Sequence, residues 1–178
     1  PSWLVGQVLD AVGPVPLGVV RWVYFELPVA AIVVAAWQLR GVTAGMWPRH
    51  YLVRTFLTLG VVGPLFYVVF PVVGPVLAFG PEGQGFELAD VWPNIVPALP
   101  SSVDSMPFDG ITPRNCMPSL HTAWALSLFI HSRRGPLWLR WGGAFWLVCT
   151  LVATLGLGAH YGVDLVAGAA LCLTVESV

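Results

Sequence analysis

The chain has 178 residues, of which 57% are hydrophobic and 10% are charged. Ordinary soluble domains carry about 25% charged residues, so the composition excludes a typical soluble globule and indicates a single membrane-embedded domain, residues 1–178. The net charge of −1 argues against a nucleic-acid-binding protein. All eight basic residues are arginines, and together with abundant Ala, Val and Gly this suggests a bacterium with a GC-rich genome.

Apolar stretches separated by polar turns predict an all-α, polytopic membrane helix bundle. Residues 1–16 predict a short interfacial helix, and residues 17–39 and 55–80 are each long enough to cross a ~30 Å hydrocarbon core. The apolar stretches at 118–130, at 141–159 and from 165 onward predict three more spans. Because the chain lacks an initiator Met and stops in an apolar run, we expect it to be trimmed at both ends, where a further span would lie.

The charged residues alternate in sign between the loops. Arginines gather at 40–54 and 131–140, whereas acids gather in the long polar stretch at 81–117. The positive-inside rule then places the acidic loop outside the cytoplasm. A loop of this length is typical of a lid or a binding loop. The three polar residues His121, His160 and Asp164 are consequently expected near the outer ends of their helices.

A serine and a histidine occur where the polar loop runs into an apolar helix, at Pro118-Ser119-Leu120-His121. We expect Pro118 at the first helical position, where the unpaired N–H groups of Leu120 and His121 and the helix dipole favour an anion. Arg114, the positive charge of the outer loop near this motif, fits a bidentate phosphate clamp.

The second polar cluster contains His160 and Asp164. Their four-residue spacing would put both side chains on one helix face, where the carboxylate could fix the tautomer of a nucleophilic or basic imidazole. His121 could supply a second proton-transfer group. Together with the anion site, these residues describe phosphoryl transfer through a histidine.

Structural explanations also exist for each feature. The His160–Asp164 pair could be a buried ion pair, Pro118-Ser119 could be only a helix start, and Arg114 could be a solvated charge. A metal site could be built from Cys116, His121, His160 and Asp164, although His160 and Asp164 are the one close ligand pair in sequence.

These motifs resemble those of the type 2 phosphatidic acid phosphatase superfamily, whose signatures are K-x-x-x-x-x-x-R-P, P-S-G-H and S-R-x-x-x-x-x-H-x-x-x-D. Residues 118–121 match the second with Leu for Gly, and His160-x-x-x-Asp164 matches the end of the third. The chain has no lysine for the first signature, and Ala153-Thr154 stands where Ser-Arg is expected. Met-Pro-Ser-Leu-His, the His-Tyr pair before the aspartate and the segment 63–71 resemble the inositol-phosphorylceramide-synthase-like branch.

The resemblance implies a six-span core, of which about five spans are visible, with its site on the extracytoplasmic face of the plasma (inner) membrane. His160 would attack phosphorus to form a phosphohistidine, assisted by Asp164. His121 would protonate the leaving oxygen and then help to activate water or an alcohol acceptor. Ser119 and the N–H of Leu120 would bind phosphate oxygens, and Arg114 would partly replace the missing cationic ligands.

The sequence therefore predicts a lipid phosphatase or phosphotransferase of lipid metabolism that acts on a lipid phosphate or phosphodiester without a metal or another cofactor. Since two cationic ligands are missing, we expect a phosphodiester to be preferred over a monoester. The alternative is a non-enzymatic membrane transporter or scaffold that uses His160 and Asp164 as a proton relay or a structural ion pair. Such a protein would not need the anion site at Ser119. The sequence does not indicate an oligomeric state.

Overall fold

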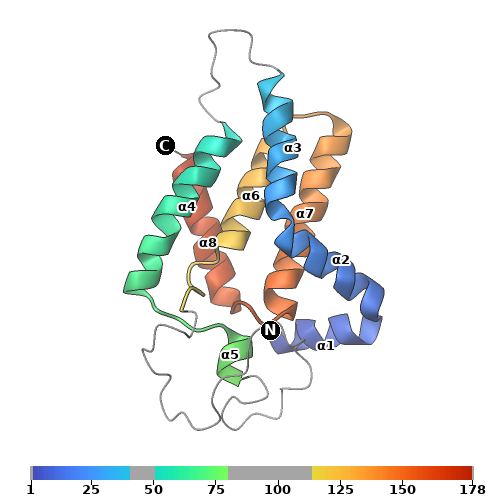
Figure 1. The fold of residues 1–178 in the computed structure, drawn as a ribbon, viewed down its shortest axis with the longest axis vertical. Coiled ribbons are helices and arrows are strands. Elements are labelled where there is room, and N and C mark those ends of the chain that lie inside the picture. Colours follow the sequence, from blue (N-terminus) through green and yellow to red (C-terminus); the bar gives the residue numbers. More distant parts are fainter. Residues whose placement is uncertain (1, 41–50, 80–113, 178) are drawn as a thin grey trace.

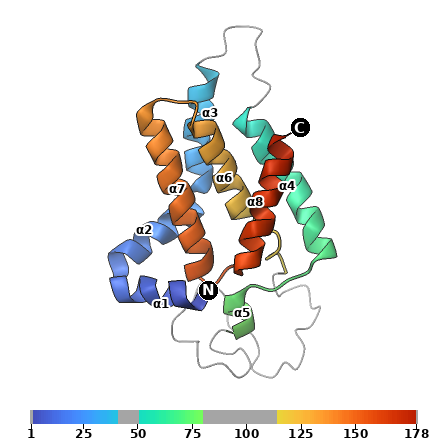
Figure 2. The same cartoon turned by 180° about the vertical axis from the view of Figure 1, so that it is seen from behind.

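A computed structural model shows the fold and describes residues 2–40, 51–79 and 114–177 (Figure 1). Within those ranges the regular elements are all helices, as predicted. They are α1 (Ser2–Val12), α2 (Pro14–Phe25), α3 (Leu27–Leu39), α4 (Leu52–Val69), α5 (Pro75–Phe79), α6 (Leu120–Ser132), α7 (Leu137–Gly156) and α8 (Gly162–Glu176). Helix α6 is central and contacts α3, α4, α7 and α8 (Figures 1 and 2).

The predicted first span is two helices rather than one. Helices α2 and α3 meet at Glu26 with a bend of 59°. Pro28 lies in the first turn of α3, and because it lacks an N–H group it cannot continue the hydrogen-bond ladder of α2. The span expected over residues 17–39 is therefore bent at Glu26, a break that the sequence analysis did not predict. The bend turns α2 toward α7, where the indole N–H of Trp146 donates to the carbonyl oxygen of Val23 at 3.1 Å.

Two helices, α4 and α7, are each long and apolar enough to cross a membrane, and the bent α2–α3 pair would add a third if it counts as one span. Helix α4 ends at Val69 instead of residue 80, because Pro71 and Gly74-Pro75 interrupt the expected helix. Helices α6 and α8, with 13 and 15 residues, measure about 20 and 23 Å, less than a ~30 Å hydrocarbon core. The structure thus fits a membrane protein, while the five visible spans and the six-span core stay predictions.

The two ends of the bundle carry different polar groups. The end of α3, the start of α4 and the α6–α7 turn lie together at the top of Figure 1 and carry Arg40, Arg54 and Arg133. The start of α6, the α7–α8 turn and the start of α8 lie at the opposite end and carry His121, His160 and Asp164. Most of the predicted acidic loop and of the first basic turn, residues 80–113 and 41–50, lies outside the described residues.

A buried polar network holds the arginine-rich end of the bundle. The carboxylate of Glu176 in α8 accepts from the Ser127 hydroxyl at 2.8 Å and lies 3.1 Å from His131 Nε2, with both partners on α6. His131 Nδ1 lies 2.9 Å from the Gln38 amide nitrogen of α3, and the Gln38 oxygen accepts from the Leu52 N–H at the start of α4. Four helices are thus joined there by hydrogen bonds.

Helix α8 approaches the start of α6 so closely that only glycine fits between them. A Cβ atom built on Gly168 would collide with the backbone oxygen of Ser119 and would lie 3.3 Å from Cβ of Thr122. The backbone of Ser119 cannot move away easily, because its N–H donates to the carbonyl oxygen of Asp164 at 3.0 Å.

We therefore expect Gly168→Ala to lower the free energy of unfolding by about 1–3 kcal/mol, the usual penalty for overpacking. Gly142→Ala is the matched control, because a Cβ there would meet nothing within 4 Å and alanine favours a helix by up to about 1 kcal/mol. Thermal unfolding of the detergent-purified proteins measures both changes. Equal stability of the two variants would contradict the close packing of α8 on Ser119.

Candidate active site

Three non-helical segments meet at the histidine-bearing end of the bundle. They are residues 114–119 before α6, residues 157–161 between α7 and α8, and residues 70–74 before α5. Three backbone hydrogen bonds tie them to one another or to the helices that follow them, from Cys116 N to Val72 O (3.1 Å), from Ser119 N to Asp164 O in α8 (3.0 Å) and from Val76 N in α5 to Gly158 O (2.8 Å). Backbone hydrogen bonds therefore hold the site in place although several of its residues, Cys116, Ser119 and His160, lie in connecting segments.

His160 precedes α8 in the non-helical segment that follows α7, so the expectation that His160 and Asp164 share one helix face was wrong. The structure nevertheless brings them together, with His160 Nδ1 3.7 Å from Asp164 Oδ2. Asp164 lies in the first turn of α8, where Oδ2 accepts from the backbone N–H of Tyr161 at 2.7 Å. Both residues are buried, His160 to 5% exposure and Asp164 to 0%.

The backbone of His160 is held from two sides. Its N–H donates to the carbonyl oxygen of Thr154 at 3.0 Å, and its own carbonyl accepts from the Ser2 hydroxyl at 2.9 Å. Thr154 is fully buried, and its hydroxyl donates to the Leu151 carbonyl at 2.8 Å. Position 154, where the resembling signature has Arg, therefore supports the backbone of His160 and supplies no positive charge.

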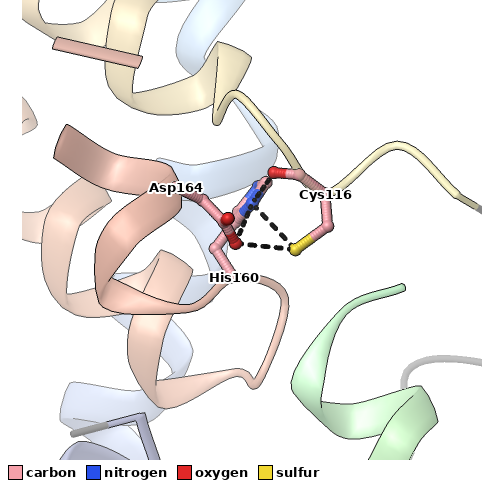
Figure 3. A group of neighbouring side chains, drawn as sticks. All are labelled: Cys116, His160 and Asp164. Atoms are coloured by element: carbon pink, nitrogen blue, oxygen red, sulfur yellow. Dashed lines mark hydrogen bonds and ion pairs between the residues drawn. The ribbon is translucent and has the colours of Figure 1, made fainter. Parts of the chain in front are cut away.

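The closest polar partner of the His160 ring is the backbone of Cys116, 2.7 Å away (Figure 3). A carbonyl oxygen can only accept, so Nδ1 must carry the hydrogen. In the neutral ring the lone pair then lies on Nε2. The carboxylate of Asp164, at 3.7 Å, is too far from Nδ1 for a hydrogen bond and acts on the ring through its charge.

The thiol of Cys116 is a second link between the two residues. Its S–H donates to Asp164 Oδ2 at 2.8 Å, while Sγ lies 3.5 Å from His160 Nδ1 (Figure 3). Burial raises the pKa of the Cys116 thiol well above its usual range, and the hydrogen bond to Asp164 and its charge raise it further. The thiol is therefore protonated at neutral pH and remains a hydrogen-bond donor to the carboxylate.

His121, the second residue of α6, lies against Tyr24 from the end of α2. The two rings are stacked, with centroids 3.9 Å apart and planes inclined by 16°, and Trp124 meets His121 edge-on at 6.1 Å. His121 and His160 are close enough to interact electrostatically. The aromatic contacts with Tyr24 and Trp124 fix the plane of the His121 ring.

Ser119 is the N-cap of α6, and Pro118 precedes it, so the placement of Pro118 at the first helical position was wrong. The Ser119 oxygen accepts from the backbone N–H of Thr122 at 3.3 Å and from the Thr122 hydroxyl at 3.0 Å. Leu120 is the first helical residue, where a backbone N–H has no acceptor within the helix. Arg114 is half-buried, two residues before Cys116.

Sequence reasoning named Cys116 only as a possible metal ligand and did not predict its hydrogen bonds with His160 and Asp164, and it missed Tyr24. The available signal was that Cys116 lies three residues before Ser119 in the polar segment, whereas Cys149 and Cys172 lie in apolar stretches. Tyr24 lies 97 positions away from His121 in sequence, and the bend at Glu26 that brings it there was not predicted.

Comparison with known proteins places the chain in a family. The sequence model of the PAP2 superfamily matches residues 3–176. The chain belongs to the PAP2 superfamily. Membership in the PAP2 superfamily supports a phosphatase-like enzyme that acts on a phosphate-bearing substrate. No curated protein and no solved structure matches the chain.

The described contacts predict that neutral His160 is the Nδ1–H tautomer. Imidazole ¹⁵N shifts of the detergent-solubilised protein should show a protonated Nδ1 and an unprotonated Nε2 for His160, with the signals assigned by their loss in His160→Gln. Signals that persist in His160→Gln come from the other histidines and serve as the internal control. A protonated Nε2 in the neutral ring would contradict the bond to the Cys116 carbonyl.

Proposed function

We propose that this PAP2 superfamily member transfers a phosphoryl or phosphoalcohol group from a lipid phosphate or phosphodiester through a phosphohistidine on His160. The observation that carries the proposal is the contact between His160 Nδ1 and the Cys116 carbonyl, because it leaves the Nε2 lone pair for attack on phosphorus. The transferred group would then go to water or to an alcohol.

The first step forms a bond from Nε2 to phosphorus and breaks the bond from phosphorus to the leaving oxygen. His121 gives the leaving oxygen a proton and afterwards accepts one from water or the alcohol acceptor. The phosphorylated imidazole keeps its Nδ1 hydrogen and is positively charged, which the buried carboxylate of Asp164 at 3.7 Å stabilises. No step requires a metal ion.

The phosphate oxygens would lie at the start of α6. The two contacts from Thr122 fill the acceptor positions of the Ser119 hydroxyl, so its hydrogen can be donated to a phosphate oxygen. The N–H of Leu120 and the positive end of the helix dipole add to this site, and Arg114 supplies a formal positive charge.

The same proposal includes the membrane setting. Arg40, Arg54 and Arg133 lie at the end of the bundle opposite His160, and arginines gather on the cytoplasmic side of membrane proteins. The site would then face outward from the plasma (inner) membrane of a bacterium. Among the described residues, α4 and α7 are long and apolar enough to span a membrane, and the bent α2–α3 pair could be a third span. A six-span core of the inositol-phosphorylceramide-synthase-like type would need further membrane-spanning helices.

Release of phosphate or headgroup from a panel of lipid phosphates and phosphodiesters, with EDTA present, tests the function. We expect His160→Ala to reduce turnover by at least about a thousandfold and Asp164→Asn by about 10²- to 10⁴-fold. Rapid quenching should trap an acid-labile, alkali-stable phosphoprotein in the wild type, and none in His160→Ala.

Ser119→Ala separates the proposal from a transporter or scaffold, because a proton relay does not need a phosphate site. His131→Gln is a control for the loss of a buried histidine away from the site. If the folded wild type turns over no lipid, with or without an alcohol acceptor, the non-enzymatic alternative is favoured.

We further expect kcat/KM to be higher for a phosphodiester than for the corresponding monoester. A diester has one negative charge and a monoester close to two, while position 154 provides no cation. Arg114→Ala should lower turnover of both substrates, and Arg114→Lys, which keeps the charge, should lower it less. Faster monoester turnover by the wild type would contradict the charge argument.

A further inference from the structure

Cys116, His160 and Asp164 form a compact set of metal-binding atoms (Figure 3). Cys116 Sγ lies 2.8 Å from Asp164 Oδ2 and 3.5 Å from His160 Nδ1, and Nδ1 lies 3.7 Å from Oδ2. A tetrahedral zinc ion with Zn–S of about 2.3 Å and Zn–N or Zn–O of about 2.1 Å separates its ligand atoms by roughly 3.3–3.8 Å. Two sides of the triangle already lie in that range, and the third, between Sγ and Oδ2, must open from 2.8 Å to about 3.6 Å.

We propose that these three side chains bind a single divalent ion of the zinc type, and that the bound ion switches off His160. The binding part stands independently of the catalytic proposal, whereas the inhibitory part rests on His160 being the phosphoryl acceptor. The ion would be a regulatory or toxic inhibitor of an enzyme whose own chemistry needs no metal.

Burial and charge both favour an ion at this place. All three residues are at most 5% exposed, and Asp164 Oδ1 is a buried oxygen with no hydrogen-bond partner among the described residues. A divalent cation with one thiolate, one carboxylate and one neutral imidazole gives a net charge of zero. Such neutrality lowers the cost of placing charges in a dry site.

Binding changes the protonation of two ligands. The Cys116 thiol loses its proton to solvent as the metal–sulfur bond forms. The hydrogen on His160 Nδ1, now donated to the Cys116 carbonyl, moves to Nε2 as the metal takes the Nδ1 lone pair. Nε2 then carries a hydrogen and has no lone pair with which to attack phosphorus.

The identity of the ligands selects the class of ion. A thiolate and an imidazole favour zinc, cobalt(II) and cadmium over magnesium and calcium, which prefer an all-oxygen shell. The protonated state of the thiol does not prevent binding, because a coordinating metal deprotonates a thiol directly. Three protein ligands leave the fourth tetrahedral position for a water molecule.

Titration of the EDTA-treated, detergent-purified chain with cobalt(II) tests the binding part. We expect one ion per chain with a thiolate-to-cobalt charge-transfer band in the near ultraviolet and strong tetrahedral bands in the visible. Cys116→Ser should lose the charge-transfer band and bind at least about tenfold more weakly, and Asp164→Asn should also bind more weakly. Cys149→Ala, a half-buried thiol of α7, is the matched control and should titrate like the wild type.

Zinc inhibition of turnover tests the second part. Micromolar zinc should inhibit turnover by the wild type, magnesium should not, and a chelator should reverse the inhibition. Cys116→Ser should need at least about tenfold more zinc to lose half of its own activity. Absence of the cobalt band in the wild type, or its persistence in Cys116→Ser, would overturn the site. If the folded protein shows the cobalt band but no turnover, the metal site is supported and the catalytic proposal is contradicted. If it shows turnover but no cobalt band, the catalytic proposal is supported and the metal site is contradicted.

Discussion

The hydrogen bond from His160 Nδ1 to the Cys116 carbonyl is the contact on which the rest of the site depends. It joins the α7–α8 turn to the segment before α6, so it links two parts of the chain that lie 44 residues apart. The segment that carries this carbonyl is held in place by two backbone hydrogen bonds, from Cys116 N to Val72 O and from Ser119 N to Asp164 O. These bonds orient the Cys116 carbonyl toward the His160 ring. Neutral backbone, rather than the carboxylate, therefore selects the tautomer, and Asp164 is left to stabilise positive charge.

Because Asp164 does not hydrogen-bond to the imidazole, its oxygen atoms are available to accept hydrogen bonds from other groups. Its Oδ2 accepts from the Cys116 thiol and from the Tyr161 N–H, and its backbone carbonyl accepts from Ser119. A buried carboxylate is costly unless hydrogen bonds compensate its lost hydration. The Cys116 thiol and the N–H of Tyr161, the N-cap of α8, supply those bonds, so the charge can lie beside the imidazole without a direct hydrogen bond to it.

Sequence reasoning predicted the helical membrane character, because apolar length and low charge are properties of composition alone. It also singled out the two histidines and Asp164, because ionisable residues are rare in so apolar a chain. It was wrong on local geometry at two positions, because His160 lies outside the helix and Pro118 lies before the N-cap. It also did not predict the break at Glu26, just before Pro28. The stacking of Tyr24 on His121 depends on that break and could not be read from spacing.

Helix α8 is anchored in its first half, by Asp164 and Gly168 against the segment before α6, and at its last residue, by Glu176 against His131 and Ser127. Each residue of an α-helix turns the chain by about 100°, so the two anchors fix the rotational phase of α8 as well as its position. The number of residues between them is therefore constrained even where the intervening side chains, such as Val166 and Leu173, lie on the exposed face of α8. Substitutions on that face are compatible with the site, whereas inserting or deleting a single residue would turn one anchor away from its partners.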